Sequence, residues 1–320
     1  MNECFTLTWV VTRSFEGFCT KERQEIFMKF YTAYCDETEM IFISMDGGKT
    51  CYRAKDLGLD YADMNALIMD FDNEKKASLE KNFAPEGNVQ LADLKLCAPI
   101  PRPRQDVICL GINYDEHAKE AGRFSDEAFG GERPYTIYFS KRVSRAAAPD
   151  ETISSYQGLV DSLDYESELG VVLGKDIKNV SKEEALDAVF GYTVINDISA
   201  RNLQTRHKQW YLGKSLDGFT PMGPCIVTPD EIGDVHDLKI SSRVNGELRQ
   251  NSNTKFMIQT VEGAIAELSA GMTLQAGTII ATGTPAGVGM GMTPPCFMNP
   301  GDEVVCEIEK IGQLRTVIGE

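Results

Sequence analysis

A proline-rich segment near residue 100 does most to limit how this chain of 320 residues can fold. Pro99, Pro101 and Pro103 alternate with other residues in "PIPRPR". Proline has a fixed φ and no backbone N–H, so neither a helix interior nor a central strand can continue through this segment. We therefore expect a boundary here, with a small domain before it and a larger one after it.

Residues 28–95 carry the signals of a small α+β domain. "EMIFISM" (39–45) predicts a strand, and "DGGKTCYRA" (46–54) predicts a turn that leads into another strand. "DMNALIMDF" (63–71) predicts a short helix, and we expect the acidic and polar residues 72–94 to form a connection.

Residues 100–320 predict short strands, turns and a few helices. "NVSKEEALDAVFG" (179–191) predicts a helix with a capping box of Ser181 and Glu184 and an end at Gly191. Three further elements are expected: a strand at 192–199, a helix at 256–271 and a β-hairpin around Gly312. Strands and helices do not alternate regularly, which argues against a doubly wound parallel sheet. The fold class predicted is α+β, with a β-rich larger domain.

Composition excludes several classes of partner. The formal net charge is −16, which argues against nucleic acid or an anionic membrane as the main partner. No apolar run approaches the roughly 20 residues that span a bilayer. Nine cysteines are present without a C-x-x-C pair, so reduced thiols in a cytoplasmic protein are the simplest interpretation.

The stretch "LDYESELGVVLG" (163–174) places two carboxylates in an apolar strand. Alternate strand residues share a face, so Glu166 and Glu168 point the same way. From this stretch alone, a half-buried strand with one face in water is the simpler interpretation. A divalent cation that bridges the two carboxylates is the more specific one. Asp197 in "YTVINDIS" would add a third oxygen, although alone it is more often a hydrogen-bonded residue. Three carboxylates suit Mg²⁺, Mn²⁺ or Ca²⁺ rather than zinc.

Other polar residues have both a catalytic and an ordinary interpretation. His117 and Glu120 are three residues apart, so on one helical turn the carboxylate could orient the imidazole as a general base. The ordinary alternative is a solvated helix start. Lys214 and Arg201 could contact an oxyanion or carboxylate, or could be a surface lysine and a structural ion pair. The other two histidines, at 207 and 236, are expected at the surface.

The glycine-rich stretch "TGTPAGVGMG" (282–291) does not fit a dinucleotide-binding loop. Met292 occupies the third glycine position when counting starts at Gly287, and Pro294 and Pro295 stand where a helix should begin. An NAD-dependent enzyme is therefore excluded. A tight turn that offers N–H groups and the Thr284 hydroxyl to an anion remains open.

Together these stretches resemble the fumarylacetoacetate hydrolase family. The matching segments are "GINYDEHAKE", "LDYESELGVVLGKD", "GYTVINDISARNLQ", "GKSLDGFTPMGP" and "IIATGTPAGVG", in the family's order. The resemblance implies a β-rich roll, a small N-terminal domain, and usually a homodimer. It implies that residues 1–27 are an extension that matters little for catalysis. It also implies that residues 120–134 form a lid over bound substrate.

The resemblance also implies a role for each candidate residue. Metal ligands would be Glu166, Glu168 and Asp197, holding Mg²⁺ or Mn²⁺; a His117–Glu120 dyad would activate water; Lys214 would lie near the reacting oxygen; and Arg201, Gln204 and Thr284 would line the substrate site. Family members often have aspartate where this chain has Asn202. Without that carboxylate, the placement of Arg201 is open.

The expected function is metal-dependent cleavage of a C–C bond in a small 2-oxo acid, through a metal-bound enolate. Acylpyruvate or fumarylacetoacetate hydrolysis and oxaloacetate decarboxylation both fit, and keto–enol isomerisation would use the same enolate. The alternatives are a 2-hydroxymuconate-type diacid isomerase or decarboxylase, and a non-catalytic interaction protein on the same scaffold.

Overall fold

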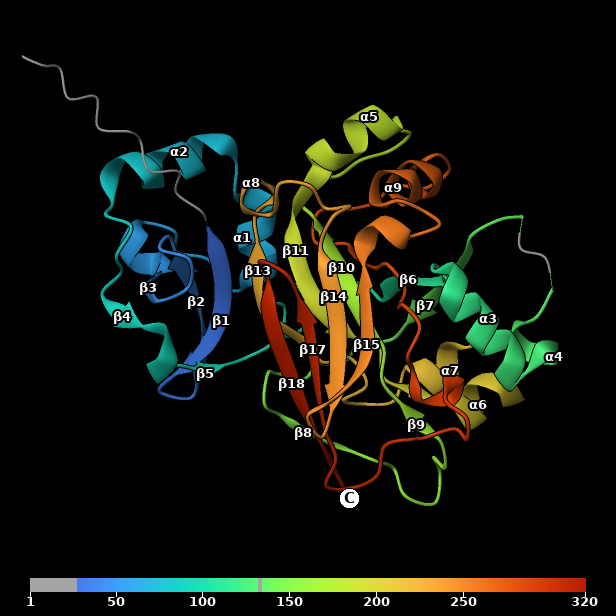
Figure 1. Ribbon diagram of the computed structural model, residues 1–320. Helices are drawn as coiled ribbons and strands as arrows, with labels where there is room; N and C mark the ends of the chain where they lie inside the picture. Colours follow the sequence, from blue (N-terminus) through green and yellow to red (C-terminus); the bar gives the residue numbers. More distant parts are fainter. Residues whose placement is uncertain (1–27, 132–133) are drawn as a thin grey trace, which may run out of the picture.

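The structure is a computed structural model that describes residues 28–131 and 134–320. The extension expected at residues 1–27 lies outside the described residues. Two sheets dominate the fold (Figure 1). Antiparallel pairing prevails, and β6–β16 and β8–β18 are the parallel pairs among the named strands described. The expectation of an α+β fold without a doubly wound parallel sheet is confirmed.

The larger sheet runs from the N-terminal part into the centre of the protein, in the order β4-β3-β2-β1-β13-β11-β10-β16-β6-β7, with β5 paired to β1. Its strands are β1 Lys29–Cys35, β2 Thr38–Ser44, β3 Thr50–Arg53, β4 Val89–Gln90, β5 Lys95–Leu96, β6 Val107–Gly111, β7 Ile137–Lys141, β10 Ser167–Leu173, β11 Val189–Asn196, β13 Met222–Val227 and β16 Ile279–Ala281. Pairing of β1 with β13 joins residues 28–96 to this sheet.

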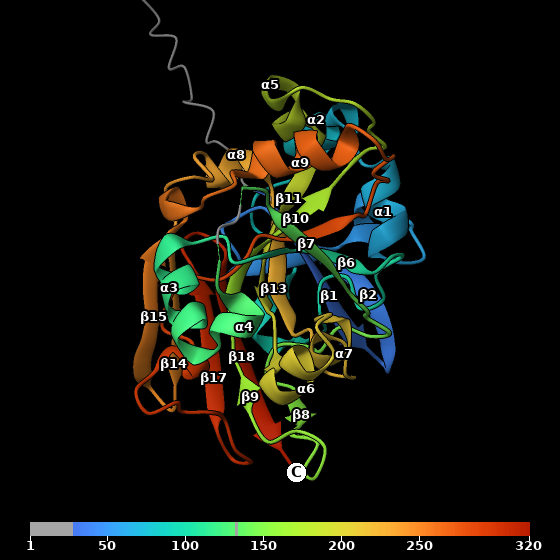
Figure 2. The ribbon, with the colours of Figure 1, turned by 90° about the vertical axis from the view of Figure 1, so that its right-hand side faces the viewer.

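The second sheet has the order β15-β14-β17-β18-β8 and packs face to face on β10, β11 and β13. It comprises β8 Thr152–Ser154, β14 Lys239–Val244, β15 Glu247–Asn253, β17 Glu303–Ile308 and β18 Gly312–Gly319. Figure 2 shows this sheet on one side of the protein and the N-terminal strands on the other. A separate pair joins β9 Leu163–Asp164 and β12 Ser199–Ala200.

Helices are short and lie around the sheets (Figure 1). The α-helices are α1 Met64–Asp70, α2 Asn73–Asn82, α3 Asp115–Phe124, α4 Asp126–Phe129, α5 Lys182–Ala185, α6 Arg201–Arg206, α7 Tyr211–Lys214, α8 Pro229–Ile232 and α9 Val261–Ser269. The 3₁₀ turns are η1 Ala54–Leu57, η2 Leu91–Asp93, η3 Leu186–Ala188, η4 Thr254–Phe256 and η5 Gly289–Gly291. Among the described helices, none has the length and apolar character needed to cross a bilayer.

Strand β10 is buried on both faces. Leu169, Val171 and Leu173 pack into the core between the two sheets, whereas Val172 packs into a second core with residues such as Phe30 and Ile43. Burial of this apolar surface is the main stabilising contribution to the centre of the fold. The ends of β10 and β11 therefore present side chains at a point that is already deep in the protein.

Most of the predicted elements are confirmed. Strands β2 and β3, helix α1, helix α9 and the β17–β18 hairpin occur where the sequence places them. All cysteines of the described ranges are free thiols. The capping box of Ser181 and Glu184 is also present.

Two predictions about helices are wrong. The expected connection at 72–94 contains helix α2, whose first turn is capped by the Asp72 carboxylate. The helix expected at 179–191 stops at Ala185, and Gly191 lies inside β11. A Cβ at Gly191 would meet Ile226 and Val227 at 2.5 Å, so this glycine permits close strand packing and does not end a helix.

Candidate active site

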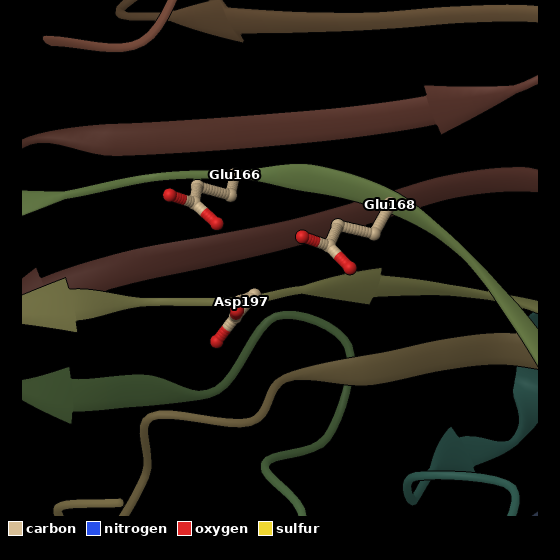
Figure 3. A group of neighbouring side chains, drawn as sticks. All are labelled: Glu166, Glu168 and Asp197. Carbon is tan, nitrogen blue, oxygen red and sulfur yellow. The ribbon is translucent and has the colours of Figure 1, made fainter. Parts of the chain in front are cut away.

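Three carboxylates converge where β10 begins and β11 ends. Glu166 immediately precedes β10, Glu168 lies within it, and Asp197 follows the last residue of β11. The Asp197 amide donates to the Glu166 carbonyl at 2.9 Å, which continues the pairing of the two strands. One oxygen from each of the three side chains lies within 4.8 Å of the others (Figure 3). The arrangement brings together the three residues that the sequence analysis grouped.

The water-exposed interpretation of Glu166 and Glu168 is wrong. Glu166 is 4% exposed, Glu168 is 1% exposed and Asp197 is fully buried. Asp197 was expected within a strand, but β11 ends at Asn196. Burying three acidic groups side by side carries a large desolvation and repulsion cost, which must be offset by cations.

Three buried cationic side chains offset part of this charge. The Lys214 ammonium lies 2.7 Å from Glu166 Oε2 and 2.6 Å from Asp197 Oδ2. The Lys141 ammonium lies 2.5 Å from Asp197 Oδ1. The Arg201 guanidinium lies 2.7 Å from Glu166 Oε1. Lys214 is therefore buried and is not a surface lysine, whereas Arg201 forms an ion pair, which was the ordinary interpretation of that residue. Catalytic roles for the two residues stay predictions.

Asp164 and Lys141 also belong to this cluster, although the sequence patterns did not single them out. Asp164 is fully buried and pairs with Arg201 at 2.8 Å, so it supplies the carboxylate that Asn202 lacks. A signal for it was present, because positions 164, 166 and 168 share one strand periodicity. Lys141 is the last residue of strand β7. Its pairing with Asp197 becomes visible only in the tertiary structure.

Charge balance makes Glu168 the exceptional carboxylate. Asp164, Glu166, Glu168 and Asp197 face Lys141, Lys214 and Arg201, which leaves four acidic groups to three cationic groups. Among the described residues, Glu168 has no ionic partner and accepts only the Gly283 amide, at 2.9 Å. Burial raises the pKa of the Glu168 carboxyl well above its usual value, and the charges of Asp197 and Glu166 add to that increase.

The pKa of Glu166 is shifted in the opposite direction from that of Glu168. Burial alone would raise the pKa of the Glu166 carboxyl, but the charges of Lys214 and Arg201 outweigh burial and lower it. Burial lowers the pKa of the Lys141 ammonium, which has one carboxylate partner. For Lys214, two carboxylate partners outweigh burial and raise the pKa. The site therefore favours ionised Glu166 and protonated Lys214, and the raised pKa of Glu168 favours its protonated form while no cation is bound.

This donor set fits a divalent cation. Three carboxylate oxygens from two chain segments are hard ligands, of the kind that Mg²⁺ and Mn²⁺ prefer. A bound dication would neutralise the charge that Glu168 carries once its proton is lost, since Glu168 has no cationic partner among the described residues. The residues that would hold it are Glu166, Glu168 and Asp197.

His117 lies beside this cluster on helix α3. Its side chain is buried, and its Nδ1 has no hydrogen-bond partner among the described residues. Glu120 Oε2 lies 3.8 Å from that Nδ1, on the same helical turn. The separation is longer than a hydrogen bond, although such contacts often tighten only when substrate binds. His207 is exposed and His236 pairs with Glu262, so both lie at or near the surface as expected.

Glu166, Glu168 and His117 border a small cavity of about 10 Å³, with room for about one water molecule. Gln204, Thr284 and Lys214 line it together with the apolar side chains of Phe129, Phe139 and Trp210. Phe129 belongs to α4, and its ring centroid lies 5.7 Å from that of Trp210. Ala121 and Phe129 of the segment 120–131 therefore form part of the cavity wall, and the cavity has no room for a substrate larger than water.

The glycine-rich stretch forms hydrogen bonds with carboxylate side chains of the same chain. The Thr284 hydroxyl donates to the Ser167 carbonyl and accepts from Gln250, so its proton is already used within the protein. Backbone amides of the stretch donate to carboxylates of the site: Gly283 to Glu168, Gly287 to Glu120, and Gly289 and Met290 to Asp164. The anion-binding turn is real, but the anions found there are side chains.

Comparison with known proteins agrees with this geometry. Residues 106–319 match the family model described as "Fumarylacetoacetate (FAA) hydrolase C-terminal". The chain is 48% identical over 229 residues to oxaloacetate tautomerase YisK of Bacillus subtilis, covering 72% of this chain and 74% of that protein. The chain belongs to the fumarylacetoacetate hydrolase family, as the sequence motifs indicate.

Solved structures show the same fold. The fumarylacetoacetate hydrolase EaFAH of Exiguobacterium antarcticum superimposes with a TM-score of 0.75 at 36% identity, covering 91% of this chain and 99% of that one. Maleylpyruvate hydrolase of Sphingobium sp. SYK-6, in complex with manganese (II) and pyruvate, gives a TM-score of 0.72 at 28% identity, covering 92% and 100%. The predicted α+β, fumarylacetoacetate-hydrolase-like fold is confirmed.

Proposed function

We propose that this protein is an Mg²⁺- or Mn²⁺-dependent enzyme that interconverts the enol and keto forms of a small 2-oxo diacid of the oxaloacetate type. The observation that carries the proposal is the buried cluster of Glu166, Glu168 and Asp197 beside a buried histidine. The name of the YisK relative supports this choice of reaction.

Tautomerisation needs only a proton carrier and stabilisation of negative charge. In the enol-to-keto direction, the 2-hydroxyl loses its proton, C3 gains one, and the C2=C3 double bond becomes C2=O. We assign the proton transfer to His117 and the orientation of its ring to Glu120. Lys214 holds positive charge beside the ligand carboxylates, and Arg201 with Gln204 would bind a substrate carboxylate. The cation, when bound, supplies Lewis-acid stabilisation of charge on the 2-oxo oxygen.

Cleavage of a C–C bond is the second candidate, because the structurally similar maleylpyruvate hydrolase contains manganese and pyruvate. In hydrolysis, the His117–Glu120 dyad would deprotonate water that attacks a distal carbonyl. In decarboxylation, the same dyad would protonate C3 after CO₂ leaves. Both reactions use the same residues, so products distinguish them better than geometry does.

The test is to follow enol-oxaloacetate, oxaloacetate and an acylpyruvate with purified protein and Mg²⁺ or Mn²⁺. We expect accelerated loss of the enol absorbance above the spontaneous rate. Pyruvate from oxaloacetate would instead identify a decarboxylase, and cleavage of the acylpyruvate a hydrolase. No turnover of any of these acids, with metal bound, would favour the non-catalytic interpretation.

His117→Ala tests the proton carrier. We expect turnover to fall by about 10²–10⁴-fold, the usual contribution of a general acid–base, with Mn²⁺ affinity within about twofold of the parent. His207→Ala is the matched control, because His207 is exposed. Collapse of metal affinity would mean that His117 is a ligand, and unchanged turnover would remove it from the mechanism.

The remaining expectations from the family stay predictions. A homodimer can be tested by sedimentation or light scattering, and a cytoplasmic location by fractionation. Independent folding of residues 28–95 can be tested by expressing that segment. The pairing of β1 with β13 means that such a segment would expose a strand edge that the whole chain covers.

A further inference from the structure

The stretch Gly283–Gly291 touches more of the site's carboxylates than any assigned role explains. Its Gly283 amide donates to Glu168 at 2.9 Å, and its Gly289 and Met290 amides donate to Asp164 at 2.7 and 3.0 Å. Its Gly287 amide donates to both oxygens of Glu120, at 3.2 and 3.0 Å. One continuous stretch thus contacts a metal-ligand candidate, the partner of Arg201 and the acid of the dyad.

We propose that this stretch is a positioning element of the active site and that Gly291 sets the place of the Glu120 carboxylate. The inference rests on the proposed function, because it assumes that Glu120 orients His117. It concerns Gly291, to which neither the sequence motifs nor the comparisons assign a role. Gly291 touches no reacting atom, so it is a positioning residue and not a catalytic one.

Contact geometry at Gly291 singles it out from the other glycines of the stretch. A Cβ built there would lie 2.5 Å from Glu120 Cδ, 2.7 Å from Oε2 and 2.9 Å from Oε1. All three atoms belong to the movable end of one side chain. At Gly287 and Gly289, by contrast, a Cβ would meet backbone oxygens at 2.1 and 2.3 Å, so substitution there would disturb the fold.

The contact has a direct consequence for the dyad. Glu120 lies between the Gly287 amide, which attracts its carboxylate, and the bare backbone of Gly291, which leaves room for it. In this position Oε2 lies 3.8 Å from His117 Nδ1. A methyl group at residue 291 would push the carboxylate away and change its distance to the imidazole, without touching the metal-ligand candidates.

Gly291→Ala is therefore a specific test. Displacement of a catalytic group by about 1 Å can cost on the order of 10²-fold in rate. We expect kcat for enol-oxaloacetate to fall by roughly 10- to 100-fold, with KM and Mn²⁺ affinity within about twofold. Gly271→Ala is the matched control, because Gly271 is exposed, lies outside the site and has open space where a Cβ would be. We expect that variant to match the parent within about twofold.

A double-mutant cycle separates positioning from a general structural effect. If Gly291 acts through Glu120, adding Gly291→Ala to Glu120→Ala should cost less than about twofold more. An equal loss in both backgrounds would overturn the proposal. A large loss for Glu120→Ala with none for Gly291→Ala would also overturn it while leaving the proposed function intact. No loss for Glu120→Ala would remove the dyad, and this inference with it.

A second pair of variants covers the case in which Gly291→Ala does not fold. The shorter side chain in a Glu120→Asp background leaves space for the added methyl group. A double variant Glu120→Asp/Gly291→Ala that folds, and that turns over substrate as fast as Glu120→Asp alone, would support the contact. Failure to fold in both backgrounds would show that residue 291 matters for reasons unrelated to Glu120 and would overturn the proposal.

Discussion

Two ends within the large sheet satisfy their polar groups in opposite ways: the N-terminal edge of the sheet at β2 and β3, and the strand ends of β10 and β11 at its centre. At the N-terminal end, Asp46 in the β2–β3 turn accepts hydrogen bonds from Ser44, Lys49 and Thr50, all within four residues. At the β10–β11 end, Asp164 accepts from Gly289, 125 residues away. The N-terminal end is thus held by local turn chemistry and apolar packing, and the other end by contacts between distant segments.

Burial of charge separates the two ends further. Every buried Asp, Glu, Lys and Arg of the described residues belongs to the cluster around Glu166 and Glu168. The core on the N-terminal side is built from apolar side chains such as Phe30, Ile43 and Leu67. Because buried ion pairs seldom stabilise a protein more than apolar packing would, the cluster is better explained by chemistry than by stability.

Asp197→Asn gives the largest effect that this contrast predicts. The substitution leaves Lys141 buried without the only carboxylate partner that it has among the described residues. Breaking a buried pair in this way costs about 3–5 kcal/mol, and metal binding should be lost as well. Chemical denaturation and calorimetric Mn²⁺ titration provide the measurements.

Two comparisons sharpen that result. Asp60→Asn removes the partner of Lys55, but both side chains are largely exposed, so the change should stay within about 0.5 kcal/mol. Asp197→Asn combined with Lys141→Met should recover stability without recovering metal binding. Equal effects of the two single aspartate substitutions would contradict the distinction between the two ends.

Glu168→Gln should reduce metal affinity but not stability. The change removes the carboxylate that has no cationic partner among the described residues, and we expect Mn²⁺ affinity to fall on the order of 100-fold. After treatment with a chelator, the variant should unfold at the same temperature as the parent or higher. Unchanged metal affinity with retained turnover would defeat the assignment of the ligands.

The pH dependence of this variant follows from the raised pKa of Glu168. A carboxyl with a raised pKa holds its proton to higher pH in the folded state than in the unfolded state. The free energy of unfolding of the chelated parent should therefore fall as pH rises above about 4.5. Glu168→Gln has no such carboxyl, so its free energy of unfolding should not fall in this way. The difference in stability between the variant and the chelated parent should therefore grow as pH rises. A constant difference across pH would show that Glu168 is not perturbed.

The same contrast explains what could be predicted from the sequence. The β2–β3 turn and the capping box at Ser181 depend on neighbouring residues, and both were predicted correctly. The E-x-E spacing and Asp197 were grouped by type and by resemblance, and their convergence supports that grouping. Lys141 could not be found in this way, because its partner Asp197 lies 56 residues away and the sequence of strand β7 contains no motif that indicates the pairing.

Asp46→Asn tests the local end of the comparison and should give the smallest effect. Burial opposes ionisation of Asp46, but hydrogen bonds from Thr50, Ser44 and Lys49 outweigh it and lower its pKa from 3.8 to about 2. A lowered carboxyl pKa adds stability that is complete above pH 3.8 and is lost as pH falls through about 2. Because the side chain is only half-buried, solvent screening reduces this contribution to about 1 kcal/mol.

Urea denaturation of Asp46→Asn and of the parent between neutral pH and pH 2 measures that contribution. The two proteins should differ at neutral pH and converge toward pH 2, whereas the exposed Asp56→Asn should differ little from the parent at any pH. Turnover and Mn²⁺ affinity should not change, since the turn lies in the N-terminal part of the sheet, outside the cavity lining. A loss of metal affinity in Asp46→Asn would show that the two ends are energetically coupled, and the division into a locally satisfied end and a catalytic end would then be wrong.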